Sequence, residues 1–187
     1  MMVRNTVLAG ILAVLMAIAG QASAETAGGR FSLIDQDGRR VTEASWPGRL
    51  RVMTFGYTFC PDVCPTTLGT IAAALDGLGP ADGDKVVALF VTVDPGRDTP
   101  QHLKAYVAAF HPRMLGLSGT ADEIAAAAKQ FHVRYAFNPP EGADPNSYSV
   151  DHTAGIWIMD GDGRFVARLG QRATVDELVQ SLRAHLH

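Results

Sequence analysis

The sequence has few cysteines and no strongly basic stretch. Its 187 residues include only two cysteines, Cys60 and Cys64, which excludes the dense disulfide frameworks of small secreted domains. The 16 lysines and arginines and the 19 aspartates and glutamates give a formal net charge of −3. Because no segment concentrates basic residues as nucleic-acid binding requires, we exclude nucleic acid as a partner.

Long apolar runs are also missing, apart from one at the N-terminus. Arg4 supplies a short positive region, residues 7–20 an apolar region, and Ala22-Ser23-Ala24 a small-residue cleavage site, which is the pattern of a secretion signal. The apolar region is shorter than the roughly 20 residues that span a bilayer. We therefore predict a signal peptide over residues 1–24 and a periplasmic mature chain. An uncleaved anchor in the inner membrane is the alternative.

The remainder, residues 25–187, is predicted to form one α/β domain. A hydrophobic fraction of 47% and a charged fraction of 19% are ordinary for a globular protein. Leu50–Tyr57 and Lys85–Val93 are nearly continuous apolar runs, as expected for parallel strands that are buried on both faces. Further strands are predicted in a short hairpin over Phe31–Thr42 and at Met114–Leu117.

Helical patterns alternate with these strands. They are predicted at Pro65–Leu78, for about ten residues after Thr99, at Ala121–Phe131, and at Val175–Leu186 with Thr174 as its N-cap. Asp160-Gly-Asp-Gly163 predicts a hairpin between strands at Thr153–Met159 and Arg164–Leu169. This order predicts a thioredoxin-like fold, with a mixed central sheet flanked by helices and a C-terminal β-hairpin and helix.

The two cysteines lie at the junction between the first buried strand and the first long helix. Pro65 is expected at the first helical position, which puts Cys64 near the helix N-cap and Cys60 in the preceding loop. Unpaired amides and the helix dipole lower the pKa of thiols at such a place, so both are candidate ligands or redox groups. A structural disulfide explains the spacing poorly, because closing so short a loop constrains the unfolded chain little.

His152 is the third candidate, because it stands at the start of the predicted C-terminal hairpin, which in this fold returns beside the strand-end loop. Two thiolates and an imidazole suit Cu(I) and can also hold Cu(II), whereas zinc usually takes a fourth ligand. A thiol–disulfide oxidoreductase that uses Cys60 and Cys64 as a redox pair without metal is the enzymatic alternative. A peroxiredoxin fits poorly, since Tyr57 stands where that class has threonine. The other five of the six histidines are predicted to lie at the surface.

Three segments in order resemble the Sco/SenC family of copper chaperones, and the likeness extends from Phe31 to the final helix. They are Gly56–Pro65, Val93–Pro100 and Tyr148–Thr153. The resemblance implies that Cys60, Cys64 and His152 bind copper. It also implies a role in assembling the binuclear copper site of cytochrome c oxidase, as metal donor, as reductant of that site's cysteines, or both. The implied partners are the copper-bearing subunit of the oxidase or another periplasmic copper protein, and a chaperone that donates copper.

Two features depart from the family pattern. Many relatives keep an N-terminal membrane helix, whereas Ala22-Ser23-Ala24 predicts cleavage. Relatives often have histidine in place of Phe59, so this chain loses a donor beside Cys60 and gains an apolar side chain there.

The acidic and basic residues of these segments have two interpretations each. Asp94, Arg97 and Asp98 are predicted to form a loop network that caps the next helix, or else a docking site for a partner. Asp151 is predicted either to orient His152 or merely to accept a backbone hydrogen bond.

Overall fold

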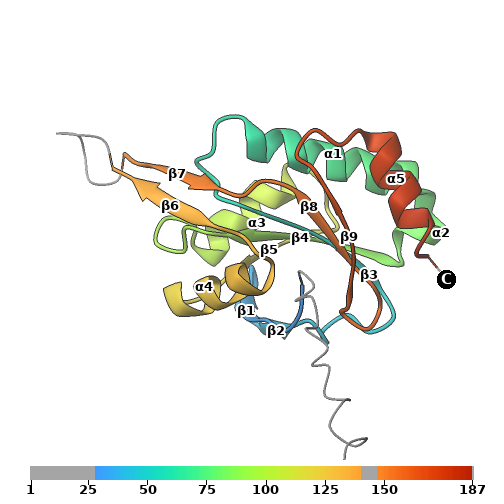
Figure 1. The fold of residues 1–187 in the computed structure, drawn as a ribbon, viewed down its shortest axis with the longest axis horizontal. Helices are drawn as coiled ribbons and strands as arrows, with labels where there is room; N and C mark the ends of the chain where they lie inside the picture. Colours follow the sequence, from blue (N-terminus) through green and yellow to red (C-terminus); the bar gives the residue numbers. More distant parts are fainter. Residues whose placement is uncertain (1–27, 140–146, 187) are drawn as a thin grey trace, which may run out of the picture.

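The computed structural model describes residues 28–139 and 147–186, which form a central sheet with helices on both faces (Figure 1). The leader predicted over residues 1–24 lies outside this range. Seven strands run in the order β2-β1-β5-β4-β3-β8-β9. They are β1 (Ser32–Asp35), β2 (Arg40–Thr42), β3 (Leu50–Gly56), β4 (Val86–Thr92), β5 (Met114–Ser118), β8 (Ile156–Met159) and β9 (Phe165–Leu169).

Three parallel strands, β3, β4 and β5, form the centre of this sheet. All seven positions of β3 and all seven of β4 are buried, as their continuous apolar runs predict. The outer strands pair antiparallel: β1 with β2 and β5 on one side, and β8 with β3 and β9 on the other. The predicted mixed sheet and both predicted hairpins are therefore confirmed.

Helices cover both faces of the sheet (Figure 1). One face carries α1 (Val63–Gly77), the short α2 (Gly79–Gly83), α3 (Pro100–Ala108) and α5 (Val175–Arg183), and the other carries α4 (Ala121–Gln130). Phe90 and Leu103 belong to the apolar core on the first face, and Phe55 and Trp157 to the core on the second. Among the residues that the structure describes, no helix has the length and apolar character needed to cross a membrane.

Threonine N-caps begin three of the helices. Thr99 caps α3, while Thr120 and Thr174 form capping boxes with Glu123 and Glu177 at the starts of α4 and α5. Each cap satisfies an amide that the first helical turn leaves unpaired. The N-cap predicted at Thr174 is confirmed.

The predicted start of α1 is wrong by two residues. The helix begins at Val63 with Asp62 as its N-cap, so Cys64 and Pro65 are its second and third residues. Amides in the first turn have no intrahelical partner, so proline is tolerated there as well as at the first position. Cys64 is therefore held inside the helix and not in front of it.

A second, two-stranded sheet was not predicted. It pairs β6 (Tyr135–Asn138) with β7 (Ser149–His152), and we call it the β6–β7 arm. The arm projects beyond one end of the main sheet (Figure 1). His152 therefore ends β7 and does not begin the C-terminal hairpin, whose first strand starts at Ile156.

Candidate metal centre

Cys64 lies in the first turn of α1, against the C-terminal end of β3. The residue is only 3% exposed. A Cβ atom at Gly56 would lie 2.5 Å from the Cys64 sulfur, so only glycine leaves room for the thiol at this point. The backbone amide of Tyr57 donates a hydrogen bond to the same sulfur. The end of β3 thus fixes the position of the Cys64 side chain.

Cys60 lies in the loop between β3 and α1. Its amide donates to the carbonyl oxygen of Tyr57 at 3.2 Å, which closes a turn at the strand end. Its side chain is partly exposed and packs against both apolar cores. Both cysteines are free thiols. Cys60 is therefore the one of the two that a partner molecule can reach.

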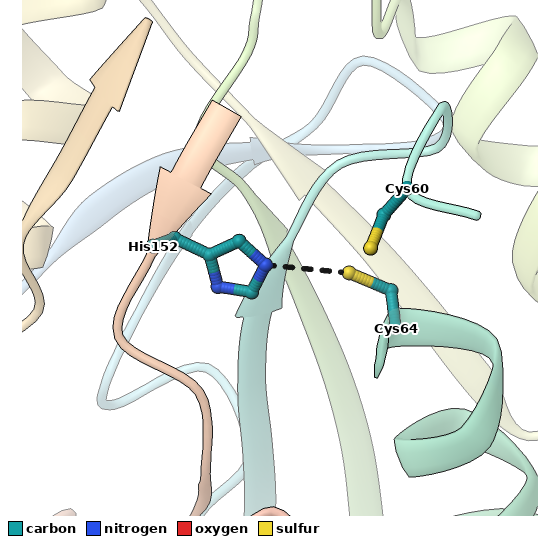
Figure 2. A group of neighbouring side chains, drawn as sticks. All are labelled: Cys60, Cys64 and His152. Carbon is teal, nitrogen blue, oxygen red and sulfur yellow. Dashed lines mark hydrogen bonds between the residues drawn. The ribbon is translucent and has the colours of Figure 1, made fainter. Parts of the chain in front are cut away.

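His152 reaches the thiols from the β6–β7 arm, although it is separated from Cys64 by 88 positions in the chain. Across the arm it pairs with Tyr135. Its ring stands edge-on to that of Tyr57, with centroids 6.1 Å apart. Its Nδ1 lies 3.4 Å from the carbonyl oxygen of Thr153, and this leaves Nε2 facing the sulfurs (Figure 2).

The three side chains converge on one small space. His152 Nε2 lies 3.5 Å from Cys64 Sγ, and Cys60 points into the same space from the loop (Figure 2). The donor atoms of all three residues lie within 4.8 Å of one another. A spread of this size fits a single ion whose bonds to nitrogen and sulfur are about 2.0 to 2.3 Å long. No other group of three such residues in the described part of the chain could hold a metal ion.

Burial controls the protonation of the site. It raises the pKa of the Cys64 thiol, and the nearby Cys60 raises that pKa further, while the Tyr57 amide partly opposes both. The predicted lowering of the thiol pKa by the helix N-terminus is therefore wrong for Cys64. Burial also lowers the pKa of His152, against smaller opposing effects of Thr153 and Asp151. The imidazole is thus neutral near pH 7, as a metal ligand must be.

The buried side chain of Asp98 holds the cysteine loop through hydrogen bonds. Asp98 accepts hydrogen bonds from the Thr58 amide at 3.1 Å and the Thr58 hydroxyl at 2.6 Å. It also accepts one from the Thr92 hydroxyl at 2.6 Å. Since Thr58 is two residues before Cys60, Asp98 ties the loop to the end of β4. The predicted loop network is confirmed, although Thr99 caps α3 and Asp98 does not.

A second network joins the loop after β4 to the β6–β7 arm. Arg97 forms an ion pair with Asp94 and donates to the Tyr148 carbonyl oxygen at 3.0 Å. Its guanidinium lies 3.6 Å from the centroid of the Tyr148 ring, whose hydroxyl donates to Asp94 at 2.9 Å. Sequence analysis missed Tyr148 as a positioning residue. Tyr148 begins Tyr148–Thr153, the third segment that resembles the family, and this position could have identified it.

Three other predictions concern residues around the site. Asp151 is exposed, and the Nδ1 of His152 contacts the Thr153 carbonyl, so Asp151 is not the orienting group. Phe59 is 52% exposed, and its ring centroid lies 4.7 Å from the Cζ atom of Arg97. His111 is buried, so its predicted place at the surface is wrong.

Comparison with known proteins identifies a family. The SCO1/SenC family matches residues 19–187. Protein sco1 of Schizosaccharomyces pombe is 38% identical over 160 residues, which are 84% of this chain and 60% of that protein. The mitochondrial SCO1 homolog 1 of Arabidopsis thaliana is 41% identical over 155 residues, 83% of this chain and 46% of that protein. The chain thus spans about half to three fifths of the length of these relatives.

Solved structures agree with this match. Copper-bound ScoI of Bradyrhizobium japonicum is 43% identical, with a TM-score of 0.77 over 86% of this chain and 100% of that chain. Copper-bound ScoI of Arabidopsis thaliana is 38% identical, with a TM-score of 0.77 over 85% of this chain and 99% of that chain. The mixed sheet with flanking helices is the thioredoxin-like fold of these structures. The chain belongs to the SCO1/SenC family.

Proposed function

We propose that this protein binds one copper ion through Cys60, Cys64 and His152 and assists assembly of the binuclear copper site of cytochrome c oxidase. The observation that carries the proposal is the convergence of two sulfurs and one neutral imidazole within 4.8 Å. Similar structures, such as ScoI of Bradyrhizobium japonicum, have copper bound. Soft sulfur donors with one imidazole select copper over hard cations.

The donor set fits both oxidation states of copper. Two thiolates and a neutral imidazole leave a Cu(I) site with a net charge near −1 and a Cu(II) site near neutral. Cu(I) accepts three ligands, so no fourth residue is needed. Loading displaces the proton that Cys64 holds through its raised pKa, and the neutral His152 offers Nε2 without losing a proton.

A copper titration of the reduced protein, followed by charge-transfer absorption, tests this function. Wild type is expected to bind about one copper ion, and Cys60→Ser, Cys64→Ser or His152→Ala to weaken binding by at least about a hundredfold. His102→Ala is the matched control, because His102 is exposed and outside the cluster. Tight stoichiometric binding by the Cys60→Ser/Cys64→Ser double variant would contradict the proposal.

The same thiols support a second candidate function, reduction of a disulfide in a copper-site partner. Partly exposed Cys60 attacks the partner's disulfide and releases one partner thiolate; Cys64 then attacks the Cys60 sulfur of the mixed disulfide and releases the second. The Cys60–Cys64 bond forms, and two electrons and two protons pass to the partner's two sulfurs. His152→Ala is expected to leave this activity largely intact while it abolishes tight copper binding. If His152→Ala lost the reductase activity together with tight copper binding, copper binding would remain the primary function.

We also propose that the mature chain works in the periplasm after removal of residues 1–24. The N-terminal pattern Ala22-Ser23-Ala24 supports cleavage before Glu25. N-terminal sequencing of protein recovered from the periplasmic fraction is expected to begin at Glu25. Recovery of the intact chain with the inner membrane would instead assign residues 1–24 as an anchor.

A further inference from the structure

A basic groove lies between the end of α4 and β6, whose Tyr135 pairs with His152 across the β6–β7 arm. It has a volume of about 800 Å³. Its lining residues combine a small apolar floor with a basic rim: Ala125, Ala128, Lys129, His132, Val133, Arg134 and Tyr135. None of these residues is acidic, although the whole chain carries a net charge of −3. The groove therefore concentrates positive charge on an acidic protein.

The two cations of the groove have no carboxylate partner in the described part of the chain. The ion pairs of the described residues include neither Lys129 nor Arg134. Lys129 stands in the last turn of α4, where the helix dipole favours a cation, so its presence there has a structural reason. Arg134 lies beyond the helix, so the dipole does not explain it. Its backbone is fixed by hydrogen bonds with Thr153, next to the ligand His152.

An aromatic strip continues from this groove to Phe59, the residue before Cys60, with Tyr135 and Tyr148 half-buried and Phe137 and Phe59 exposed. Tyr135 contacts Phe137 with ring centroids 5.9 Å apart, and Phe137 contacts Tyr148 at 5.6 Å. Arg97 then lies between the rings of Tyr148 and Phe59. Phe59 and Phe137 are 52% and 47% exposed and are the large exposed hydrophobic side chains of the described residues. Exposed aromatic side chains that stand together mark interaction surfaces.

We infer that the basic groove and the aromatic strip form one docking surface for an acidic protein partner that exchanges copper with this site. This inference rests on the proposed copper function. Carboxylates of the partner would face Lys129 and Arg134, and an apolar side chain would lie on the groove floor and against Phe137. A partner that also covers Phe59, the residue before the accessible thiol Cys60, would bring its own ligands to the ion. A small anion would use the cations alone and would leave the aromatic strip uncovered.

Charge reversal in the groove separates docking from metal binding. The probe is the purified, copper-free soluble domain of the cytochrome c oxidase subunit that carries the binuclear copper site. Lys129→Glu/Arg134→Glu is compared with Lys85→Glu/Arg183→Glu, a control with the same change in net charge on exposed residues outside the groove. Titration calorimetry at two salt concentrations gives the affinity for the probe, and absorption gives the copper affinity of each variant.

The groove variant is expected to bind copper as wild type does but to bind the probe at least about tenfold more weakly, with little salt dependence left. Phe137→Ala is expected to weaken probe binding severalfold, and the control variant to match wild type. Equal probe binding by the groove variant and wild type would overturn the inference, as would an equal loss in the control. Absence of any complex between wild type and the probe would overturn it too.

Two further outcomes separate this inference from the proposed function. Wild type that forms the complex but binds no copper would refute the copper function and support the docking surface. The second experiment measures binding of wild type and the groove variant to vesicles of phosphatidylcholine and phosphatidylglycerol. Vesicle binding by wild type that is lost in the groove variant, without any change in probe binding, would assign the groove to a membrane surface and overturn the inference.

Discussion

The end of β3 and the β6–β7 arm meet at the candidate metal centre, but they are built in very different ways. Every position of β3 is buried, and β3 pairs with β4 along its whole length and with β8 along part of it. In β6 three of four residues are exposed, and in β7 only Val150 is buried. Cys64 therefore belongs to the buried core and Cys60 to the loop beside it, whereas the imidazole belongs to a small sheet in which most residues are exposed.

This difference shows which interactions matter for each ligand. Cys64 is placed by close packing against Gly56, so its position depends on volume. His152 ends β7, in contact with Tyr57 and the Thr153 carbonyl oxygen, and the other end of β7 is held by the contacts of Arg97 with Tyr148. Changes in packing at Gly56 should therefore displace Cys64, and loss of the Arg97–Tyr148 contacts should displace His152.

The largest effect is expected from Gly56→Ala. The new Cβ would lie 2.5 Å from Cys64 Sγ and 2.9 Å from the Phe90 ring, so the thiol or the ring has to move. We expect a loss of about 1 to 3 kcal/mol in the free energy of unfolding and a fall of about a hundredfold in copper affinity. Urea unfolding and copper titration measure the two quantities.

Gly69→Ala is the matched control for this substitution. Gly69 lies in α1, and a Cβ there meets nothing within 4 Å. Alanine is expected to stabilise the helix by up to about 1 kcal/mol and to leave copper binding unchanged. If both alanine variants bound copper like wild type, close packing at Gly56 would not be what positions Cys64.

Arg97→Ala tests the arm side of the comparison. The variant loses the guanidinium that stacks on Tyr148 and donates to its carbonyl oxygen. We expect copper affinity to fall by about tenfold. The free energy of unfolding should fall too, because the buried Asp94 loses its ion-pair partner. Arg97→Lys should rescue little, because an ammonium lacks the planar face that stacks on the ring. Full rescue by lysine would contradict the stacking argument.

Amide hydrogen exchange sharpens the same comparison without any substitution. In the metal-free protein we expect β7 amides to exchange by local opening of the arm, and β4 amides to exchange much more slowly. Copper should slow exchange in β7 at least about tenfold at saturating concentrations and change β4 little, because only the closed arm supplies His152 to the ion. Equal exchange rates in β7 and β4 before loading would contradict the difference between arm and core.

The smallest effect is expected from Asp98→Asn, read as a change in pH dependence. Burial raises the pKa of Asp98, although Thr58 and Thr92 donate hydrogen bonds that oppose this. The folded protein then holds this proton more tightly than the unfolded chain does. The contribution of Asp98 to stability is therefore present in acid and is lost as pH rises through the raised pKa.

Unfolding free energies at several values between about pH 4 and pH 7 measure this contribution. As the pH rises, the free energy of unfolding of wild type should fall relative to that of Asp98→Asn. A difference that grows in favour of wild type would mean that the pKa is lowered.

The central strands and the identity of the three candidate ligands could be predicted from the sequence. Continuous apolar runs identify β3 and β4, and the two cysteines lie directly after the first of them. The arm could not be predicted in this way, because Tyr135–Asn138 and Ser149–His152 are short and mostly exposed. The direction of the Cys64 pKa shift also depends on burial, which the position in the helix does not reveal.

The separation of His152 from Cys64 by 88 positions has a consequence for folding. An unfolded chain offers two neighbouring thiols to a metal, but it brings the imidazole to them only at the entropic cost of closing a long loop. The complete donor set therefore exists only after β3, α1 and the β6–β7 arm have come together. Copper held by all three ligands distinguishes a finished molecule from an unfolded one, and its retention can serve as a measure of completed folding.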